Sequence, residues 1–208
     1  ISNTPKQIVI YNALGFKHPK FAHLPLIMGE DGGRMSKRTG AVAVTEYKKM
    51  GYLSEGLVNY LMLLGWSPAN NQEKVALKTA IKNFSIKKVN KAAAVFAMDK
   101  LRWLNSQYIR EMQTNALVDL LIPFLKEKDY ISEDFDSQSL VPIVDLFKGR
   151  LFTLLDFLEW ADFYFIDAVN FDAEAKEKYL SEDRSNEFDL LAKRFERLED
   201  FSSSSVEE

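Results

Sequence analysis

Apolar residues recur at helical spacing along most of the chain beyond residue 45. In the segment 101–112 they fall at positions i, i+3, i+7 and i+11, and in the segment 117–125 at i, i+3, i+4, i+7 and i+8. The segment 55–64 is apolar almost all round, which is typical of a buried helix. The pattern predicts a mainly α protein, with further helices over 46–50, 72–82, 142–147, 153–165, 173–180 and 188–198.

The first 44 residues follow a different pattern. A helix is expected from Gln7 to Leu14, started by Asn3, Thr4 and Pro5 and ended by Gly15. The apolar residues 26–28 predict a short buried strand or its end. The segment 29–40 contains four glycines and little apolar content, so we expect a flexible loop there.

Polar residues and prolines set the expected helix boundaries beyond this loop. Short polar side chains before apolar segments are typical N-caps, and Pro123 should kink or end the helix that contains it. Gly51 and Gly65 should end the helices before them. The expected N-caps are Thr45, Ser54, Ser85, Asp99 and Asp172.

Composition excludes several classes of protein. Of the 208 residues, 47% are hydrophobic and 27% are charged, so wholesale disorder is excluded. The chain has no cysteine, so disulfides are excluded. It has only two histidines, so we expect no metal site. No apolar run reaches about 18 residues and the N-terminus lacks a secretory signal, so we expect no membrane association. The first residue is Ile1, which indicates a processed chain or a fragment of a longer protein.

The net charge of −3 hides an asymmetry between the two halves. Residues 1–113 carry 17 Lys and Arg against 7 Asp and Glu, a net charge of +10. Residues 114–208 carry 10 against 23, a net charge of −13. The first half could face a nucleic acid or another phosphate-bearing partner, or the two halves could attract each other.

The sequence RMSKR, residues 34–38, is the main candidate for chemistry. It places three cations within five residues, directly after the glycines of the expected loop. Cations on a movable backbone suit a loop that closes over phosphates, where they meet charge that develops in the transition state. Five residues alone are also compatible with a solvated basic surface loop.

The residues on both sides of this motif resemble segments of a known protein family. Residues 1–7, ISNTPKQ, are similar to a segment that follows a histidine in bacterial-type glutamyl-tRNA synthetases, and RMSKR is similar to the KMSKS signature of class I synthetases. The resemblance extends over residues 1–108. It also rests on Phe21 to Ile27, Asp31, Gly32, Tyr47, Gly51, Tyr52, Asn59, Tyr60, Leu61, Leu64, Gly65, Trp66, Pro68, Phe96, Lys100, Leu101, Trp103, Leu104, Asn105 and Tyr108.

The resemblance implies part of an ATP-dependent ligase that charges tRNA(Glu) with glutamate in the cytoplasm, as a monomer. ATP with Mg²⁺ and L-glutamate would be substrates of the complete enzyme, and no metal would bind within this chain. The family's HIGH signature and most of its Rossmann core would lie upstream of Ile1. The expected domains are the C-terminal edge of the catalytic domain over 1–44, a helical stem-contact region over 45–113 and an all-α anticodon-binding region over 114–208, expected to be truncated.

The resemblance also implies roles for individual residues. Lys37 would contact the ATP phosphates as the catalytic cation, and Arg34 would replace the first lysine of KMSKS. Met35 and Ser36 would shape the loop, and Arg38 would add a phosphate contact. The basic segment beside Trp103 and two cations of the acidic half are candidates for tRNA contact: Lys87, Lys88, Lys91, Lys100, Arg102, Lys148 and Arg150.

Other side chains favour structural roles. His23 lies among apolar residues and is expected to be packed and hydrogen-bonded, and the carboxylates Glu159, Asp162 and Asp167 are expected on solvated helix faces. The aromatic residues expected in the core are Tyr60, Trp66, Trp103 and Tyr108.

Two further functions stay open on the sequence. One is a tRNA-binding module without catalysis. The other is a glutaminyl-tRNA synthetase, in which a β-barrel would follow instead of the helices expected after Thr114.

Overall fold

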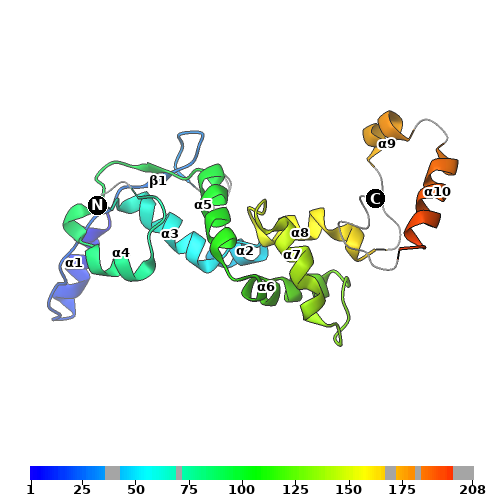
Figure 1. Ribbon diagram of the computed structural model, residues 1–208. Coiled ribbons are helices and arrows are strands. Elements are labelled where there is room, and N and C mark those ends of the chain that lie inside the picture. The colour runs from blue at the N-terminus through cyan, green and yellow to red at the C-terminus, as the bar shows by residue number, and fades with distance from the viewer. Residues whose placement is uncertain (36–42, 69–71, 167–171, 181–183, 199–208) are drawn as a thin grey trace. The chain divides into compact units, whose positions relative to one another are not determined.

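The computed structural model describes residues 1–35, 43–68, 72–166, 172–180 and 184–198, and helices make up most of these ranges (Figure 1). The chain divides into two compact units, Ile1–Phe165 and Ile166–Glu208. The mainly α fold predicted from the sequence is confirmed. None of the helices in the described ranges combines the length and the apolar content needed to cross a bilayer.

The first unit contains all described elements up to residue 165. They are α1 (Thr4–Ala13), β1 (Ile27–Met28), α2 (Val44–Lys49), α3 (Ser54–Gly65), α4 (Leu77–Asn83), η2 (Ile86–Lys88), β2 (Ala94–Val95), α5 (Met98–Glu111), α6 (Thr114–Glu127), η3 (Ser137–Ser139), α7 (Leu140–Lys148), α8 (Leu154–Trp160) and η4 (Asp162–Tyr164). The strands β1 and β2 pair in parallel, with Ile27 opposite Ala94 and Met28 opposite Val95.

The second unit contains two short helices among its described residues, α9 (Ala173–Tyr179) and α10 (Ser185–Phe195). Asp172 caps α9 as expected, because its carboxylate accepts a hydrogen bond from the Ala175 N–H. Neither helix contains a buried residue, so the described part of this unit has no core of its own.

An aromatic core holds α2, α3 and α5 together. Its buried members come from all three helices, from the turn between α2 and α3 and from the residue after β2, and Met35 packs against them at the end of the segment 29–35. Tyr60 lies edge-on to Phe96, with ring centroids 5.0 Å apart. The buried members are Tyr47, Tyr52, Leu57, Tyr60, Phe96, Leu101 and Leu104.

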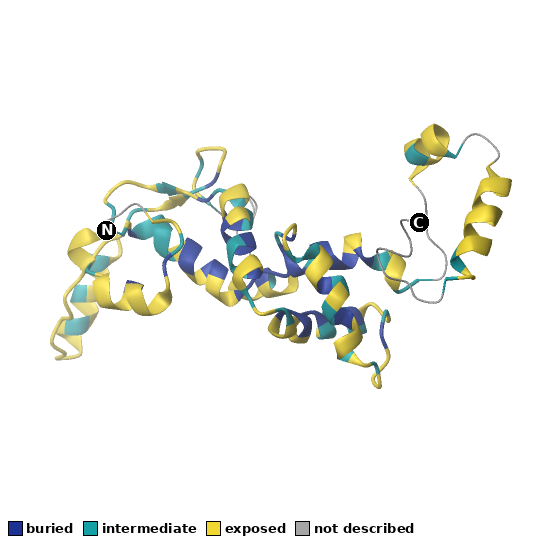
Figure 2. Cartoon of the chain, viewed as in Figure 1, coloured by how far each residue is buried: buried dark blue, intermediate teal, exposed yellow. Residues whose placement is uncertain are grey.

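A second, aliphatic core lies between α6, α7 and α8 (Figure 2). The spacing predicted from the sequence is confirmed here, because Leu117, Leu121 and Leu125 are fully buried on one face of α6. Leu53 and Ile109 also join this core from the segments around α3 and α5. The helices that follow Thr114 are therefore packed directly onto the region before it.

Some predicted helix boundaries are wrong. The helix expected from Gln72 begins only at Leu77, since the Asn59 amide donates to the Glu73 carbonyl and accepts from the Val75 N–H at 2.8 Å. Those two bonds hold the chain extended before α4. Of the two outcomes expected for Pro123, a kink or a helix end, the helix end is wrong, since α6 continues to Glu127.

The predicted side-chain caps of four helices are also wrong. The residues before α2, α3 and α5 are Ala43, Leu53 and Ala97, and Thr45, Ser54 and Asp99 lie inside the first turns. Ser85 does precede η2 but makes no side-chain cap. The first turn of α5 takes a partner from elsewhere in the chain, because the Met98 N–H donates to Glu30 Oε1 at 3.0 Å.

The helix α3 is less buried than its apolar sequence predicts. Leu57 and Tyr60 are buried in the aromatic core, but Val58 and Leu61 are 45% and 38% exposed. The apolar surface of this helix therefore exceeds what the described part of the chain covers.

Candidate functional site

The segment that leads into RMSKR is an ordered turn. The Gly29 N–H donates to the Gly33 carbonyl at 2.8 Å, and the Gly33 N–H donates to Asp31 Oδ1 at 2.9 Å. The Met35 N–H donates to the Ile27 carbonyl at 3.1 Å, which brings the chain back beside β1. The prediction of a flexible loop over 29–40 is therefore wrong for residues 29–35, which form an ordered turn. We call residues 29–35 the loop stem.

The loop stem is attached to β2 and α5. The Phe96 N–H donates to the Met28 carbonyl at 2.9 Å, and Glu30 Oε1 accepts from the Met98 N–H at 3.0 Å. Met35 packs against the aromatic core. These contacts attach the stem and its flanking strand to β2, to α5 and to the aromatic core.

Arg34 is the first cation of the motif and lies on the stem. Arg34 forms an antiparallel backbone bridge with Met28 and is exposed to solvent. Ser36, Lys37 and Arg38 lie outside the described residues, so their predicted contacts with ATP phosphates stay predictions. A guanidinium at this position can bind a phosphate with two parallel hydrogen bonds.

Tyr60 holds the start of α5 from the core side. Its hydroxyl donates to the Ala97 carbonyl at 2.9 Å and accepts from the Ala97 N–H at 2.7 Å. Burial raises the pKa of this phenol above its ordinary value, which keeps the hydroxyl neutral and able to donate. The residue before α5 is thus fixed by two bonds to one side chain.

The middle of α5 contains a buried polar joint. Asn105 is fully buried, and its side-chain oxygen accepts from the Leu53 N–H at 2.9 Å while its amide donates to the Phe152 carbonyl at 2.6 Å. One side chain therefore connects the start of α3, the helix α5 and the segment before α8. We call these contacts the Asn105 joint.

Two glycines allow close approach around this joint. Gly51 has φ +77°, and a Cβ there would lie 2.8 Å from the backbone nitrogens of Leu154 and Leu155. Its carbonyl accepts from the Leu154 N–H at 2.9 Å. A Cβ on Gly56 would lie 2.6 Å from the Asn105 side-chain oxygen. A larger residue at Gly51 would push its turn away from α8, and one at Gly56 would push α3 away from α5.

The predicted tRNA-contacting cations near α5 divide into two groups. Lys100 forms an ion pair with Glu73 at 2.8 Å, and Arg102 pairs with Asp156 at 3.6 Å and lies over the Phe152 ring. These two cations are thus engaged within the chain. The remaining three are exposed and form no ion pair with other described residues: Lys87, Lys88 and Lys91.

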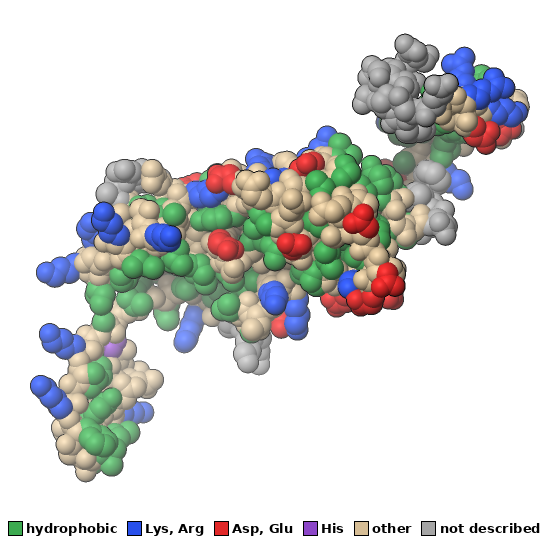
Figure 3. All heavy atoms as spheres, turned by 60° about the horizontal axis from the view of Figure 1, so that its bottom comes forward, with side chains coloured by type: hydrophobic (Ala, Val, Ile, Leu, Met, Phe, Trp, Pro, Cys, Tyr) green, Lys and Arg blue, Asp and Glu red, His purple; other side chains and the backbone are tan. Residues whose placement is uncertain are grey.

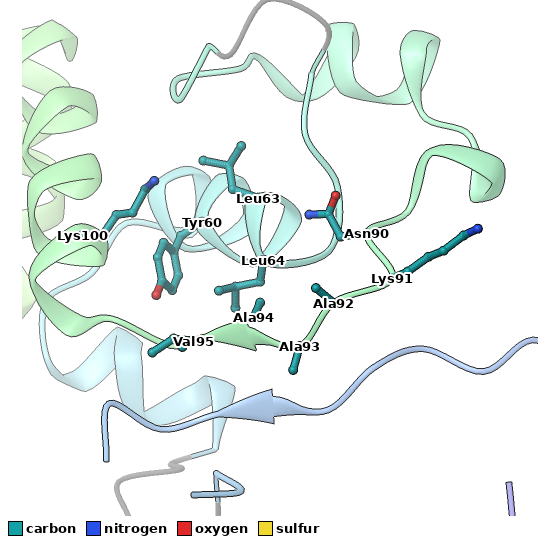
Figure 4. A pocket seen from close by; sticks show the side chains of 10 residues that line it. All are labelled: Tyr60, Leu63, Leu64, Asn90, Lys91, Ala92, Ala93, Ala94, Val95 and Lys100. Atoms are coloured by element: carbon teal, nitrogen blue, oxygen red, sulfur yellow. The ribbon is translucent and has the colours of Figure 1, made fainter. Parts of the chain in front are cut away.

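An open hollow of about 360 Å³ lies between α3 and the segment before β2 (Figure 4). Lys91 and Lys100 lie on its rim, and the Lys91 side chain extends away from the other lining residues. The floor consists of small and aliphatic side chains, which suits packing more than recognition. The full lining is Tyr60, Leu63, Leu64, Asn90, Lys91, Ala92, Ala93, Ala94, Val95 and Lys100.

The two cations predicted in the acidic half lie near the end of α7. Lys148 donates a long hydrogen bond of 3.5 Å to the Thr114 hydroxyl, and Arg150 is exposed. Figure 3 shows Lys and Arg side chains along the part of the first unit that holds α1 and α4, with Asp and Glu gathered over the part that holds α6 and α7. The charge asymmetry of the sequence is thus visible on the surface.

The structural roles expected for other side chains hold only in part. Tyr60 and Trp66 are buried, but Trp103 is 41% exposed, because it lies on the outer face of α5. His23 is exposed and has one long contact, 3.4 Å from its Nε2 to the Thr4 hydroxyl, so its expected packing is wrong. Glu159 is exposed and Asp162 is half-buried, whereas Asp167 lies outside the described residues.

Sequence reasoning missed the residues that position the stem and the joint. Glu30 was one polar residue in a glycine-rich segment, and only its bond to an amide 68 residues away reveals its role. Asn105 carried a usable signal, since a polar amide between Leu104 and Ile109 on the apolar face of a helix must find partners when buried. Within the described ranges no cluster of acidic or histidine side chains has the arrangement of a metal site.

Comparisons with known proteins agree along the whole chain. Residues 1–103 match the catalytic domain of class I tRNA synthetases of the E and Q type, and residues 116–208 match an anticodon-binding domain. Glutamate–tRNA ligases of Geotalea uraniireducens and Geobacter sulfurreducens are 42% and 40% identical over the full chain. The chain spans 44% of the length of each of these relatives.

Solved structures give the same result. A glutamate–tRNA ligase from Elizabethkingia meningosepticum, solved in complex with its amino acid, superposes with a TM-score of 0.78 at 30% identity. The match covers 99% of this chain and 44% of that chain. These relatives give no support to a non-catalytic module or to a glutaminyl-tRNA synthetase with a β-barrel after Thr114, where the structure has α6, α7 and α8. The chain belongs to the glutamyl-tRNA synthetase family of class I aminoacyl-tRNA synthetases.

Proposed function

We propose that this chain supplies the phosphate-contacting loop and the tRNA-binding helices of an ATP-dependent glutamate–tRNA ligase in the cytoplasm. In the first step a glutamate carboxylate oxygen attacks the α-phosphorus of ATP, which forms glutamyl-adenylate and releases pyrophosphate. In the second step a hydroxyl at the 3′ end of tRNA(Glu) attacks the activated carbonyl and releases AMP. L-glutamate, ATP with Mg²⁺ and tRNA(Glu) are the proposed substrates and partners of the complete enzyme, acting as a monomer.

The observation that carries this proposal is the loop stem. It delivers RMSKR from an ordered turn whose ends are fixed to β2, α5 and the aromatic core. In the proposal, Lys37 follows the negative charge that moves onto the pyrophosphate, and Arg34 and Arg38 assist it. Met35 anchors the base of the motif, and Ser36 shapes the backbone between anchor and cation.

The proposed division of labour follows the predicted domains. Residues 1–44 belong to the catalytic domain, 45–113 to a helical stem-contact region and 114–208 to an anticodon-binding region. Lys87, Lys88 and Lys91 are the proposed phosphate contacts of the tRNA inner side, because they are exposed and unpaired with other described residues. Lys148 and Arg150 are proposed to act locally in the anticodon-binding region.

A pyrophosphate-exchange assay tests the proposal. With tRNA(Glu) present, the complete enzyme should catalyse glutamate-dependent ATP–pyrophosphate exchange, and Lys37→Ala should lower its kcat by about 10²- to 10³-fold, since a transition-state contact is lost. The matched control is Lys78→Ala, an exposed lysine of α4. A Lys37→Ala enzyme with unchanged kcat and a raised KM for ATP would mean that this lysine binds only the ground state.

The isolated 208-residue chain is expected to be inactive in the same assay. It spans 44% of its curated relatives, and the adenine and glutamate sites of the family are not among the motifs of this sequence. Exchange activity in a highly purified preparation of the chain would contradict that assignment.

A further inference from the structure

The N-terminal end of α5 is held by a side chain from outside the helix. Ala97 precedes the helix, and its methyl group cannot accept a hydrogen bond from the first turn. The carboxylate of Glu30 does so instead, because its Oε1 accepts from the Met98 N–H at 3.0 Å. A negative charge is favoured at this end of a helix, since the unpaired N–H groups there carry partial positive charge.

Glu30 lies in the turn of the loop stem. It is flanked by Gly29 and Asp31, whose bonds close the turn, and RMSKR begins four residues later. The turn has no apolar side chain of its own before Met35. Among the described contacts of residues 29–34, the bond between Glu30 and the Met98 N–H is the one through which a side chain of the turn binds a helix.

We propose that Glu30 is a positioning residue for the phosphate-contacting loop. Its bond to Met98 holds the turn that carries Arg34 and that precedes Lys37 and Arg38. The inference rests on the proposed function, because its consequence is felt by the ATP phosphates. Glu30 touches no substrate and acts through the backbone it holds. Release of the turn would leave the motif attached through Met35 and β1 alone, and would widen the range of positions open to its cations.

A helix-capping role alone would have different consequences. Asp99 is an exposed carboxylate in the first turn of the same helix, and it has no described bond to the loop stem. Removal of either carboxylate weakens the favourable charge at this helix terminus. Only removal of Glu30 releases the stem. Asp99→Ala is therefore the matched control for Glu30→Ala.

Pyrophosphate exchange by the complete enzyme separates the two roles. Glu30→Ala should lower kcat by about tenfold or more, since misplacing reacting groups by about 1 Å can cost up to 10²-fold. The KM for ATP should change by less than about twofold, since ground-state binding is left in place. Glu30→Gln should recover most of the rate, because its amide oxygen can still accept from Met98. Asp99→Ala should match the wild type.

Hydrogen exchange at Met98 provides a readout that does not depend on activity. In the 208-residue chain its amide should exchange faster in Glu30→Ala than in Asp99→Ala. Equal rates in the two variants, or equal kcat values in an active enzyme, would overturn the inference. A wild-type enzyme without glutamate-dependent exchange in the presence of tRNA(Glu) would instead overturn the proposed function, and the Met98 amide would still decide whether Glu30 holds the stem.

Discussion

The two attachments of α5 differ in kind. At its N-terminal end the helix holds the loop stem through Glu30, an exposed side chain with one bond to Met98. At its middle it holds α3 and the segment before α8 through Asn105, a fully buried side chain with two bonds to backbone groups. The attachment through Glu30 is therefore exposed to water, whereas the Asn105 side chain of the second attachment is buried.

The difference teaches how one helix can hold both a solvent-exposed turn and a buried framework. A buried hydrogen bond cannot be exchanged for one to water, so the Asn105 joint opens only when the packing around it opens. An exposed bond is exchanged for one to water at small net cost, so the bond between Glu30 and Met98 can open while the cores stay intact. The Glu30 bond can therefore open without disturbing the helices that the Asn105 joint holds together.

The largest effect is expected from Asn105→Ala. It removes the partner of the buried Leu53 N–H and of the partly buried Phe152 carbonyl, and an unsatisfied buried group costs about 1–3 kcal/mol. We expect the free energy of unfolding to fall by about 4 kcal/mol in urea denaturation of the chain. Asn115→Ala, at an exposed position of α6, is the control and should change it by less than about 0.5 kcal/mol. Near-equal losses in the two variants would remove the distinction between sealed and open attachments.

The second largest effect is expected from Gly51→Ala. The new methyl group would meet two backbone nitrogens at 2.8 Å in a residue with positive φ, so both strain and a clash oppose it. We expect a loss of about 3 kcal/mol in the same denaturation experiment, from overpacking and backbone strain together. Gly149→Ala is the control, because it has φ −66° and open space around a new Cβ. A stable Gly51→Ala variant would show that α8 can retreat from this turn.

A smaller effect separates paired from unpaired cations. Neutralising Lys87, Lys88 and Lys91 in the complete enzyme should reduce the salt slope of tRNA(Glu) binding by about 0.7–0.9 per lost phosphate contact. Neutralising Lys100 and Arg102 should leave the slope nearly unchanged, since both cations are paired within the chain. Filter binding over a salt series measures both. A wild-type slope in the triple variant would mean that the basic charge faces the protein and not the tRNA.

The smallest effect is expected from Arg102→Ala. Its partner Asp156 also accepts from the Phe152 and Thr153 N–H groups at 2.8 Å each, so the carboxylate stays hydrogen-bonded without the arginine. Arg102 is itself half-exposed and 3.6 Å from the carboxylate. A loss of about 1 kcal/mol or less is expected for such a pair. A loss as large as that of Asn105→Ala would place the ion pair, and not the amide, at the centre of the joint.

Periodicity predicted the parts of the fold that depend on local pattern. The buried face of α6 follows from the spacing of Leu117, Leu121 and Leu125, and the cap of α9 follows from Asp172. Polar contacts between residues far apart in the sequence could not be predicted from periodicity. The late start of α4 depends on bonds from Asn59, and the start of α5 depends on Glu30 and Tyr60.

The sequence predicted the motif of the candidate site, but not the contacts that hold the motif in place. RMSKR and its likeness to the KMSKS signature gave the cations, because their identity is local information. The turn that holds them depends on a parallel pairing between β1 and β2, which are separated by more than 60 residues. Two-residue strands carry too little alternation for such a pairing to be read from sequence.

Native-state hydrogen exchange tests the difference between the two attachments most directly. The Leu53 amide, bonded to Asn105, should exchange only through global unfolding, so its opening free energy should fall with urea as steeply as the global value. The Met98 amide, bonded to Glu30, should exchange about 100-fold faster or more, through a local opening that responds little to urea. Equal opening free energies with equal urea dependence at Leu53 and Met98 would contradict the account.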